Sequence, residues 1–312
     1  MHGIDVRENV PLSGLTRFGL GGPAAILVES DREQPFLEAL QAARAAGFPW
    51  LVLGGGSNLV VADRGWAGVV LRYRGVRVTM EGGAIRAESG ADLQALVDFS
   101  IERGLAGLHT MTRIPGWVGG AIYGNAGAYG HSVMEFVSSV RLFDGRTVRS
   151  ITNAACRFTY RESVFKRNKN WIILSAGFVL PPGDRAALAA KAEEIRAIRD
   201  AKYPPSMKCA GSIFKNCIVS ELPAAVAARI PAAQIREGKV ASGWFLEQAG
   251  MKGFRCGGIR VADYHANLVY NDGDGTAEQV RTVVAEARRR VREQFGFDLE
   301  EEVQYVGFED GA

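Results

Sequence analysis

The sequence has no run of eighteen apolar residues, so we expect no membrane-spanning helix. Its 37 Lys and Arg residues nearly balance 34 Asp and Glu residues, and a net charge of +3 does not indicate a nucleic-acid-binding protein. The first residues, MHGIDVRENVPLSG, lack the charged-then-apolar pattern of a signal peptide. We therefore expect a protein that binds neither a membrane nor a nucleic acid.

Cysteine is scarce, and its spacing carries no metal or redox motif. Cys156, Cys209, Cys217 and Cys256 form no CxxC pair, so we expect no metal site. Reduced thiols in the cytoplasm are the simplest interpretation. A catalytic role for Cys209 or Cys217 stays open, although single cysteines are more often inert.

Three standard motifs are also missing. There is no GxxxxGK[ST] loop, which disfavours a P-loop nucleotide triphosphatase, and no GxGxxG, which disfavours a Rossmann dinucleotide site. The sequence has no GxSxG motif either, so a hydrolase nucleophile is not indicated.

Glycine, by contrast, is concentrated in two stretches. Residues 114–130, IPGWVGGAIYGNAGAYG, hold six glycines in seventeen residues, and we expect neither an ordinary helix nor an ordinary strand there. This density predicts backbone that approaches a ligand closely, and the apolar side chains of the stretch argue against a linker. Residues 54–58, GGGSN, follow a short apolar run; they could be an ordinary tight turn, or a turn whose N–H groups suit a phosphate. We expect one large phosphate-bearing ligand to lie across both stretches.

Hydrophobic periodicity and turn residues predict a mixed α+β chain in three segments, residues 1–73, 74–201 and 202–312. Helices are predicted over residues 31–47, 91–103, 184–201, 242–250 and 276–295. Strands are predicted over residues 24–28, 50–53, 59–61, 69–71, 76–80, 84–88, 137–143, 146–151, 171–180, 268–270 and 299–307. Gly82-Gly83 and Asp144-Gly145 predict hairpin turns, and Thr276 with Gln279 predicts a capping box.

Three further segments carry polar groups with open roles. Residues 156–166 alternate basic and aromatic side chains; an arginine there could bind a carboxylate, but a solvated strand edge is the simpler interpretation. Ser212 follows small residues and could donate a proton or cap a helix. In a strand over 299–307, Glu301 would face away from Glu300 and Glu302.

Seven motifs in order resemble the UDP-N-acetylenolpyruvoylglucosamine reductase family, in its shorter, type II form. The motifs are FGLGGP, LGGGSNLVV, IPGWVGGAIYGNAGAYG, FTYRESVFK, AGSIFKN, the AGMKG–HAN–VYN series and LEEEVQYVG. The resemblance implies an α+β fold: a two-lobed FAD-binding unit of the vanillyl-alcohol-oxidase/PCMH type (lobes 1–73 and 74–201) and a C-terminal α+β substrate-binding domain (202–312). It also implies NADPH-dependent reduction of UDP-N-acetylglucosamine enolpyruvate to UDP-N-acetylmuramate through FAD, in peptidoglycan synthesis, by a cytoplasmic monomer.

The resemblance implies roles for individual residues. Arg161 and Glu302 would flank the enolpyruvyl carboxylate, Ser212 would donate the proton, and Lys215 or a bound water would tune Ser212. The cofactor-binding residues would be Gly54, Gly55, Gly56, Ser57, Asn58, Pro115, Gly116, Gly119, Gly120, Asn125, Gly127, Ala128 and Tyr129. The substrate-binding residues would be Tyr129, Arg199, Lys202, Lys215, Asn216, Lys252 and His265.

The sequence departs from the family pattern at several positions. Trp117 stands where a small residue is usual, inside the flavin-binding stretch, and could stack on the ligand or narrow its pocket. Glu301 replaces a usual proline, so Glu300 competes with Glu302 for the catalytic role. Two other functions stay open: a different flavoenzyme of the same fold that oxidises small alcohols or sugars, and a non-catalytic nucleotide-sugar-binding protein.

Overall fold

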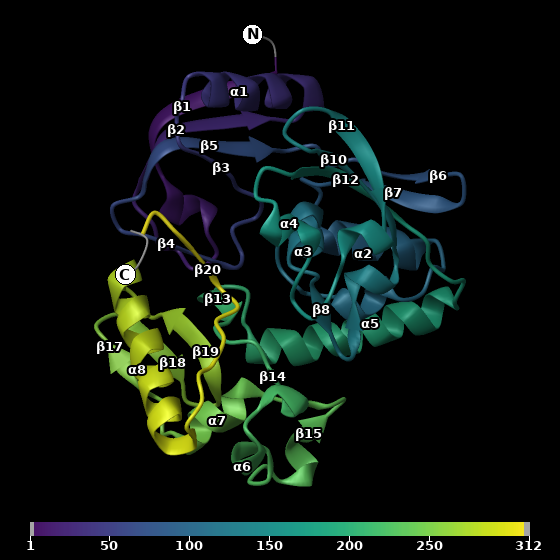
Figure 1. The fold of residues 1–312 in the computed structure, drawn as a ribbon. Helices are drawn as coiled ribbons and strands as arrows, with labels where there is room; N and C mark the ends of the chain where they lie inside the picture. The colour runs from purple at the N-terminus through teal and green to yellow at the C-terminus, as the bar shows by residue number, and fades with distance from the viewer. Residues whose placement is uncertain (1–2, 309–312) are drawn as a thin grey trace. The chain divides into compact units, whose positions relative to one another are not determined.

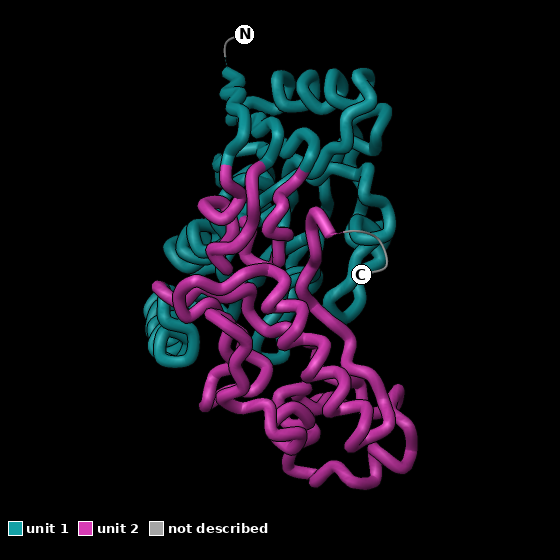
Figure 2. The backbone as a smooth tube through the Cα atoms, turned by 90° about the vertical axis from the view of Figure 1, so that its left-hand side faces the viewer, with its two compact units in different colours: residues 1–10, 24–55, 67–205 teal, residues 11–23, 56–66, 206–312 magenta. Residues whose placement is uncertain are grey.

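The computed structural model describes residues 3–308 and groups the chain into two compact units (Figure 2). Unit 1 contains the residues up to 10, residues 24–55 and residues 67–205, whereas unit 2 contains residues 11–23, residues 56–66 and the residues from 206 onwards. The chain therefore passes between the units several times near its N-terminus. The glycine turn over 54–58 crosses one of these boundaries.

The first sheet of unit 1 has four strands in the order β1-β2-β5-β3 (Figure 1). Its strands are Asp5–Pro11 (β1), Pro23–Ser30 (β2), Trp66–Tyr73 (β5) and Trp50–Val52 (β3). Helix α1 (Glu33–Ala45) contributes Phe36, Leu37 and Leu40 to a buried cluster with Leu71 of β5 and Phe143 of the second sheet. This apolar stripe fixes the helix on the sheet and joins the two sheets of unit 1.

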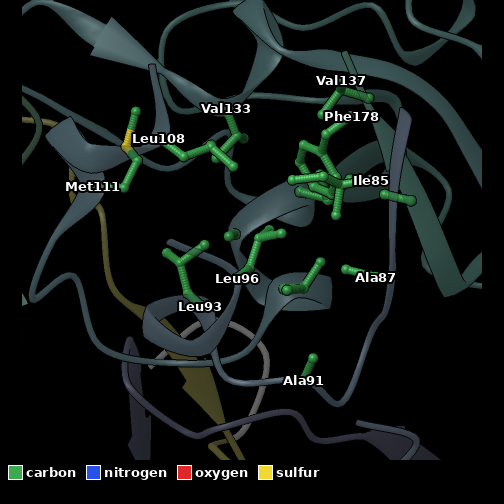
Figure 3. Close-up of a cluster of buried hydrophobic side chains, with 14 of the residues drawn as sticks. Ile85, Ala87, Ala91, Leu93, Leu96, Leu108, Met111, Val133, Val137 and Phe178 are labelled. Carbon is green, nitrogen blue, oxygen red and sulfur yellow. The ribbon is translucent and has the colours of Figure 1, made fainter. Parts of the chain in front are cut away.

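The second sheet of unit 1 is antiparallel, with the strand order β11-β10-β12-β7-β6. Its strands are Val148–Thr152 (β11), Val137–Phe143 (β10), Ile172–Phe178 (β12), Ala84–Glu88 (β7) and Val78–Glu81 (β6). The associated helices are Leu93–Glu102 (α2), Val118–Tyr123 (α3), Val164–Arg167 (α4) and Arg185–Lys202 (α5), and a small hairpin joins Gly127–Ala128 (β8) to His131–Ser132 (β9). Figure 3 shows Leu93 and Leu96 of α2 in the core with Ile85 of β7 and Phe178 of β12.

Unit 2 is built on an antiparallel sheet of four strands in the order β13-β19-β18-β17. These strands are Lys208–Ser212 (β13), His265–Asn271 (β19), Ile259–Ala262 (β18) and Arg255–Cys256 (β17). Smaller elements of the unit are Leu59–Val61 (β4), Gln304–Val306 (β20), Cys217–Ile218 (β14), Ile235–Arg236 (β15), Lys239–Val240 (β16) and Ala224–Ala227 (α6). Helices α7 (Ser242–Gln248) and α8 (Ala277–Phe295) bury Phe245 and Phe295 in one core, their rings in edge contact at 5.1 Å.

The structure confirms the mixed α+β class and most of the predicted elements. The hairpins around Gly82-Gly83 and Asp144-Gly145 are present as β6–β7 and β10–β11. The predicted capping box is also present, because Thr276 and Gln279 bond each other's backbone N–H groups at the start of α8.

Three local predictions are wrong. Residues 118–123 of the glycine-rich stretch form helix α3, because backbone carbonyls of the neighbouring β7–α2 connection fix its first turn. The closing strand is only β20, since Glu300, Glu301 and Glu302 pair irregularly with residues 213–215 before it. Residues 156–166 are turns and helix α4 rather than a strand edge, with Arg157 and Arg161 at positive φ.

Among the helices of residues 3–308, none combines the length and the apolar character that a membrane span requires. Within the same residues, no group of three or more His, Cys, Asp or Glu side chains is arranged to hold a metal ion.

Candidate active site

The two glycine-rich stretches meet within unit 1. A Cβ atom added at Gly55 would lie 3.0 Å from Gly116 Cα and 3.2 Å from Trp117 Cδ1, and one added at Gly54 would lie 3.9 Å from Trp117 Cε3. The backbone of the 54–58 turn therefore packs directly on the start of the 114–130 stretch. Glycine allows this close approach, because a side chain at position 55 would press on the neighbouring segment.

A buried arginine lies beside this contact. Arg72 of β5 is only 9% exposed; its Nη1 donates to Glu29 Oε1 at 2.8 Å and its Nη2 donates to the Gly54 carbonyl at 3.3 Å. Its guanidinium also lies over the Trp117 ring, 4.6 Å from the centroid. Burial lowers the pKa of Arg72, and the Glu29 charge opposes that shift. Arg72 was not among the residues predicted from the sequence, where its signal is a cation inside the apolar run of β5.

The remaining residues of the turn belong to unit 2. Gly56 has φ +61°, and a Cβ atom there would lie 2.0 Å from the Leu15 carbonyl oxygen, so only glycine fits. Asn58 Nδ2 donates to the Ala210 carbonyl of β13 at 3.1 Å, and the Asn58 carbonyl accepts from Gln304 N at 3.1 Å. This end of the turn is thus fastened to the strand that ends in Ser212.

Within the 114–130 stretch, two glycines have opposite surroundings. Val118 N donates to the Ala91 carbonyl at 2.8 Å and Gly119 N to the Ser89 carbonyl at 2.9 Å, which fixes the start of α3. A Cβ atom at Gly119 would lie 2.9 Å from Ser89 Cβ, so the helix fits closely against that segment. A Cβ atom at Gly120 would meet no atom within 4 Å, so that face of α3 is open.

Arg161 is attached to the second half of the same stretch. Its Nη2 donates to the Gly127 carbonyl at 2.9 Å and its Nη1 to the Asn125 carbonyl at 3.4 Å. The buried Asn125 side chain donates to the Thr159 carbonyl at 2.8 Å and accepts from Met134 N at 3.2 Å. The structure thus brings Arg161, Asn125 and Gly127 together in unit 1.

The other predicted residues of unit 1 lie at its surface or on α5. Tyr129 is 50% exposed at positive φ, directly after Ala128 of β8, and Pro115 is half-buried. Arg199 and Lys202, at the end of α5, both lie over the ring of Tyr203, at 5.6 and 5.4 Å from its centroid. Desolvation and the neighbouring Arg199 charge lower the pKa of Lys202.

In unit 2, Ser212 lies next to the acidic segment 300–302. Ser212 is the last residue of β13, opposite Leu268 of β19, so it does not cap a helix. Glu302 N donates to the Ile213 carbonyl at 2.7 Å, and Lys215 N donates to the Glu300 carbonyl at 2.9 Å. The segment that carries the three glutamates therefore runs alongside the residues that follow Ser212.

The three glutamates have different partners. Glu300 has a 72% exposed side chain, and its Oε1 accepts from the buried Lys215 Nζ at 2.5 Å. Glu301 Oε1 accepts from Arg288 Nη1 at 3.2 Å. Glu302 is half-buried, and its backbone pairs with the residue next to Ser212. Glu300, the competitor on sequence grounds, is thus engaged by Lys215.

Asn267 is a buried polar residue that organises this region, and it was not among the predicted site residues. It is 2% exposed; its Nδ2 donates to the Phe214 carbonyl at 2.8 Å and to Ser242 Oγ at 2.9 Å, and its Oδ1 accepts from Phe214 N at 2.9 Å. The Asn267 carbonyl also accepts from Ile213 N at 3.2 Å. An amide inside an apolar strand was the available signal, since a buried amide requires partners.

The remaining predicted substrate contacts lie around this sheet. His265 begins β19 and lies against α7, where a Cβ atom at Gly243 would come within 3.3 Å of its Cε1. Lys252 is exposed and paired with Glu247, and Asn216 is exposed after Lys215.

Two family models match the chain. Residues 24–149 match the FAD binding domain, and residues 203–306 match the C-terminal domain of UDP-N-acetylenolpyruvoylglucosamine reductase. The first matched region lies mostly in unit 1 and the second mostly in unit 2.

Relatives match over nearly the full length. The chain is 54% identical over 304 residues to the UDP-N-acetylenolpyruvoylglucosamine reductase of Solibacter usitatus (strain Ellin6076), with 97% of each chain covered. It is 37% identical over 302 residues to that of Rubrobacter xylanophilus (strain DSM 9941), with 95% of this chain and 94% of the relative covered. The crystal structure of the Thermus caldophilus reductase matches with a TM-score of 0.76 at 27% identity, covering 97% of this chain and 99% of that one.

Proposed function

The chain belongs to the UDP-N-acetylenolpyruvoylglucosamine reductase family, and from this premise we propose that it reduces UDP-N-acetylglucosamine enolpyruvate to UDP-N-acetylmuramate with FAD and NADPH. It is an FAD-dependent oxidoreductase of peptidoglycan synthesis with an FAD-binding domain and a C-terminal domain of this family. As part of the proposal, residues 1–73 and 74–201 are the lobes that hold FAD, and residues 202–312 bind the UDP-sugar. NADPH as the reductant, a cytoplasmic location and a monomeric state belong to the same proposal.

The residues around the glycine turn fit FAD. Among residues 3–308, the backbone N–H groups of Gly55, Gly56 and Ser57 have no hydrogen-bond acceptor in the chain, and such consecutive donors suit a diphosphate. The open face at Gly120 leaves room for a planar ring close to the backbone of α3. We propose that the diphosphate binds residues 54–58 and that the predicted residues of the 115–129 range contact the rest of the cofactor.

When bound, the flavin supplies the transfer of a hydride from NADPH to C3 of the enolpyruvyl group. Negative charge then develops on C2 and spreads into the adjacent carboxylate. We propose that the Arg161 guanidinium stabilises this charge, which is the usual way an enzyme lowers such a barrier. Its hydrogen bonds to the Asn125 and Gly127 carbonyls hold the guanidinium plane in a fixed orientation.

In the proposed second half of the reaction, the Ser212 hydroxyl gives its proton to C2 and recovers a proton from solvent. Glu302 would orient the groups that bind the enolpyruvyl carboxylate of the substrate. The Lys215 ammonium beside Glu300 would favour ionisation of the Ser212 hydroxyl. The observation that carries this assignment is the backbone bond between Glu302 N and the Ile213 carbonyl, at 2.7 Å, which holds Glu302 beside the end of β13. We assign Tyr129, Arg199, Lys202, Asn216, Lys252 and His265 to substrate binding.

The test of the proposed function is a titration of purified protein followed by visible absorption. The loaded protein should show a flavin spectrum that NADPH bleaches under anaerobic conditions and that the enolpyruvyl UDP-sugar restores. NADPH oxidation should require that UDP-sugar. Failure to bind FAD would refute the proposal, and rapid oxygen consumption with a simple alcohol or sugar would favour an oxidase of the same fold.

A further inference from the structure

A buried cation next to the glycine turn has no role in the chemistry described above. Arg72 is held in unit 1 by three neighbours: the Glu29 carboxylate, the Trp117 ring and the Gly54 carbonyl. Buried arginines are rare, because removing a guanidinium from water is costly unless it is paired. Such a group, kept beside a segment proposed to bind diphosphate, calls for a functional explanation.

We propose that Arg72 is a positioning residue that orients the Gly55 N–H group toward the diphosphate of FAD. The proposal rests on the proposed function, because it takes the 54–58 turn as the diphosphate site. It adds a residue from outside the glycine motif, and it gives Trp117 a place in the same arrangement.

The orientation follows from the geometry of the peptide bond. Arg72 Nη2 donates to the Gly54 carbonyl at 3.3 Å, so this carbonyl points at the guanidinium. In a planar trans peptide the N–H group points opposite to the carbonyl, so the N–H of Gly55 points away from Arg72. That N–H has no acceptor among residues 3–308. Arg72 therefore holds the donor outward.

Two neighbours keep the guanidinium in place. Glu29 is 5% exposed and also pairs with Arg7, so the carboxylate is itself fixed. Trp117 packs its ring along Gly54 and Gly55 and covers the guanidinium at 4.6 Å. A small residue at position 117 would leave one face of Arg72 without this contact, so the tryptophan strengthens the arrangement in this chain.

The test compares Arg72→Lys and Arg72→Met with a matched arginine of the same unit. Arg103 lies over the Phe99 ring at 3.4 Å and donates to the Phe99 carbonyl at 3.1 Å, so Arg103→Lys removes the same kinds of contact away from the turn. The dissociation constant of FAD is measured by titrating apo-protein and following flavin fluorescence. A lysine ammonium lacks the rigid planar fork that bonds Glu29 and Gly54 while stacking on Trp117, so Arg72→Lys should weaken FAD binding about tenfold and Arg72→Met more. Arg103→Lys should leave the dissociation constant unchanged.

A second readout separates positioning from general damage. At saturating FAD, Arg72→Lys should keep the wild-type flavin absorption maximum, because the proposal places its effect at the diphosphate and not at the ring. In wild-type protein, the amide signal of Gly55 should shift when ADP is added to the apo-protein, a measurement that needs no variant. Wild-type affinity in Arg72→Lys, an altered flavin spectrum, or an unmoved Gly55 signal would overturn the proposal. If wild-type protein itself fails to bind FAD, the proposed function fails instead.

Discussion

The glycine-rich segments and the Ser212 region are positioned by different means. Around residues 54–58 and 114–130, backbone lies against backbone, and glycine supplies the space. Around Ser212, one buried amide and backbone pairing with residues 300–302 fasten the strand end. A segment that must approach a ligand closely uses residues without side chains, whereas a segment that presents one side chain needs rigid support behind it.

This difference decides how each substitution should behave. In the glycine-rich segments, an added methyl group should lower the free energy of unfolding wherever protein atoms fill the space. Where the space is open, it should weaken only the binding of the cofactor. In the Ser212 region, removal of a buried hydrogen-bonding group should lower the free energy of unfolding.

Gly56→Ala should have the largest effect, because its Cβ atom would lie 2.0 Å from the Leu15 carbonyl oxygen and the residue has φ +61°. We expect a loss of about 4 kcal/mol in the free energy of unfolding, measured by urea denaturation of the apo-protein. Gly14→Ala is the control, since a Cβ atom there meets nothing within 4 Å. Equal stability of the two variants would show that the contact with Leu15 does not require glycine at position 56.

Asn267→Leu keeps the side-chain volume and removes the hydrogen bonds to Phe214 and Ser242. The Phe214 N–H group would be buried without an acceptor, whereas the Phe214 carbonyl would keep its bond from Ser242 Oγ at 3.2 Å, so the change should cost about 2 kcal/mol of unfolding free energy. Gln248→Leu makes the same chemical change at an exposed position of α7 and should change stability by less than about 0.5 kcal/mol. Wild-type unfolding free energy in Asn267→Leu would mean that the Ser212 region does not depend on this amide.

Gly119→Ala and Gly120→Ala add the same methyl group at a filled and at an open position of helix α3. The Gly119→Ala methyl group would meet Ser89 Cβ at 2.9 Å, so we expect a loss of about 1 kcal/mol in unfolding free energy. Gly120→Ala has open space, so its apo-protein should gain up to about 1 kcal/mol from helix propensity while FAD binding weakens. Thermal melts of apo-protein and FAD titrations measure the two effects. Unchanged FAD affinity in Gly120→Ala would remove this face of α3 from the proposed cofactor site.

Much of the fold was predictable because its signals are local. The Gly82-Gly83 and Asp144-Gly145 turns, and the capping box of Thr276 and Gln279, each specify their own geometry. The family and the mixed α+β class were predictable from motifs in a fixed order. The proposed residues remain predictions, although the structure brings several of them together within each unit.

The features that sequence reasoning missed depend on distant partners. Helix α3 forms despite its glycines because the Ala91 and Ser89 carbonyls accept its first N–H groups. Arg72 and Asn267 are buried through contacts with residues far along the chain, and neither belongs to a local pattern. The acidic segment departs from strand alternation because residues 213–215 pair with it only irregularly.

Rapid mixing of the Ser212→Ala variant tests whether Ser212 donates the proton while the glycine-rich segments hold the flavin. The variant should bind FAD as wild type does, because no glycine contact changes. We predict that NADPH reduces its flavin at the wild-type rate, whereas reoxidation by UDP-N-acetylglucosamine enolpyruvate falls by a factor of about a hundred or more. Normal reoxidation in this variant, or loss of the NADPH half-reaction, would contradict the account.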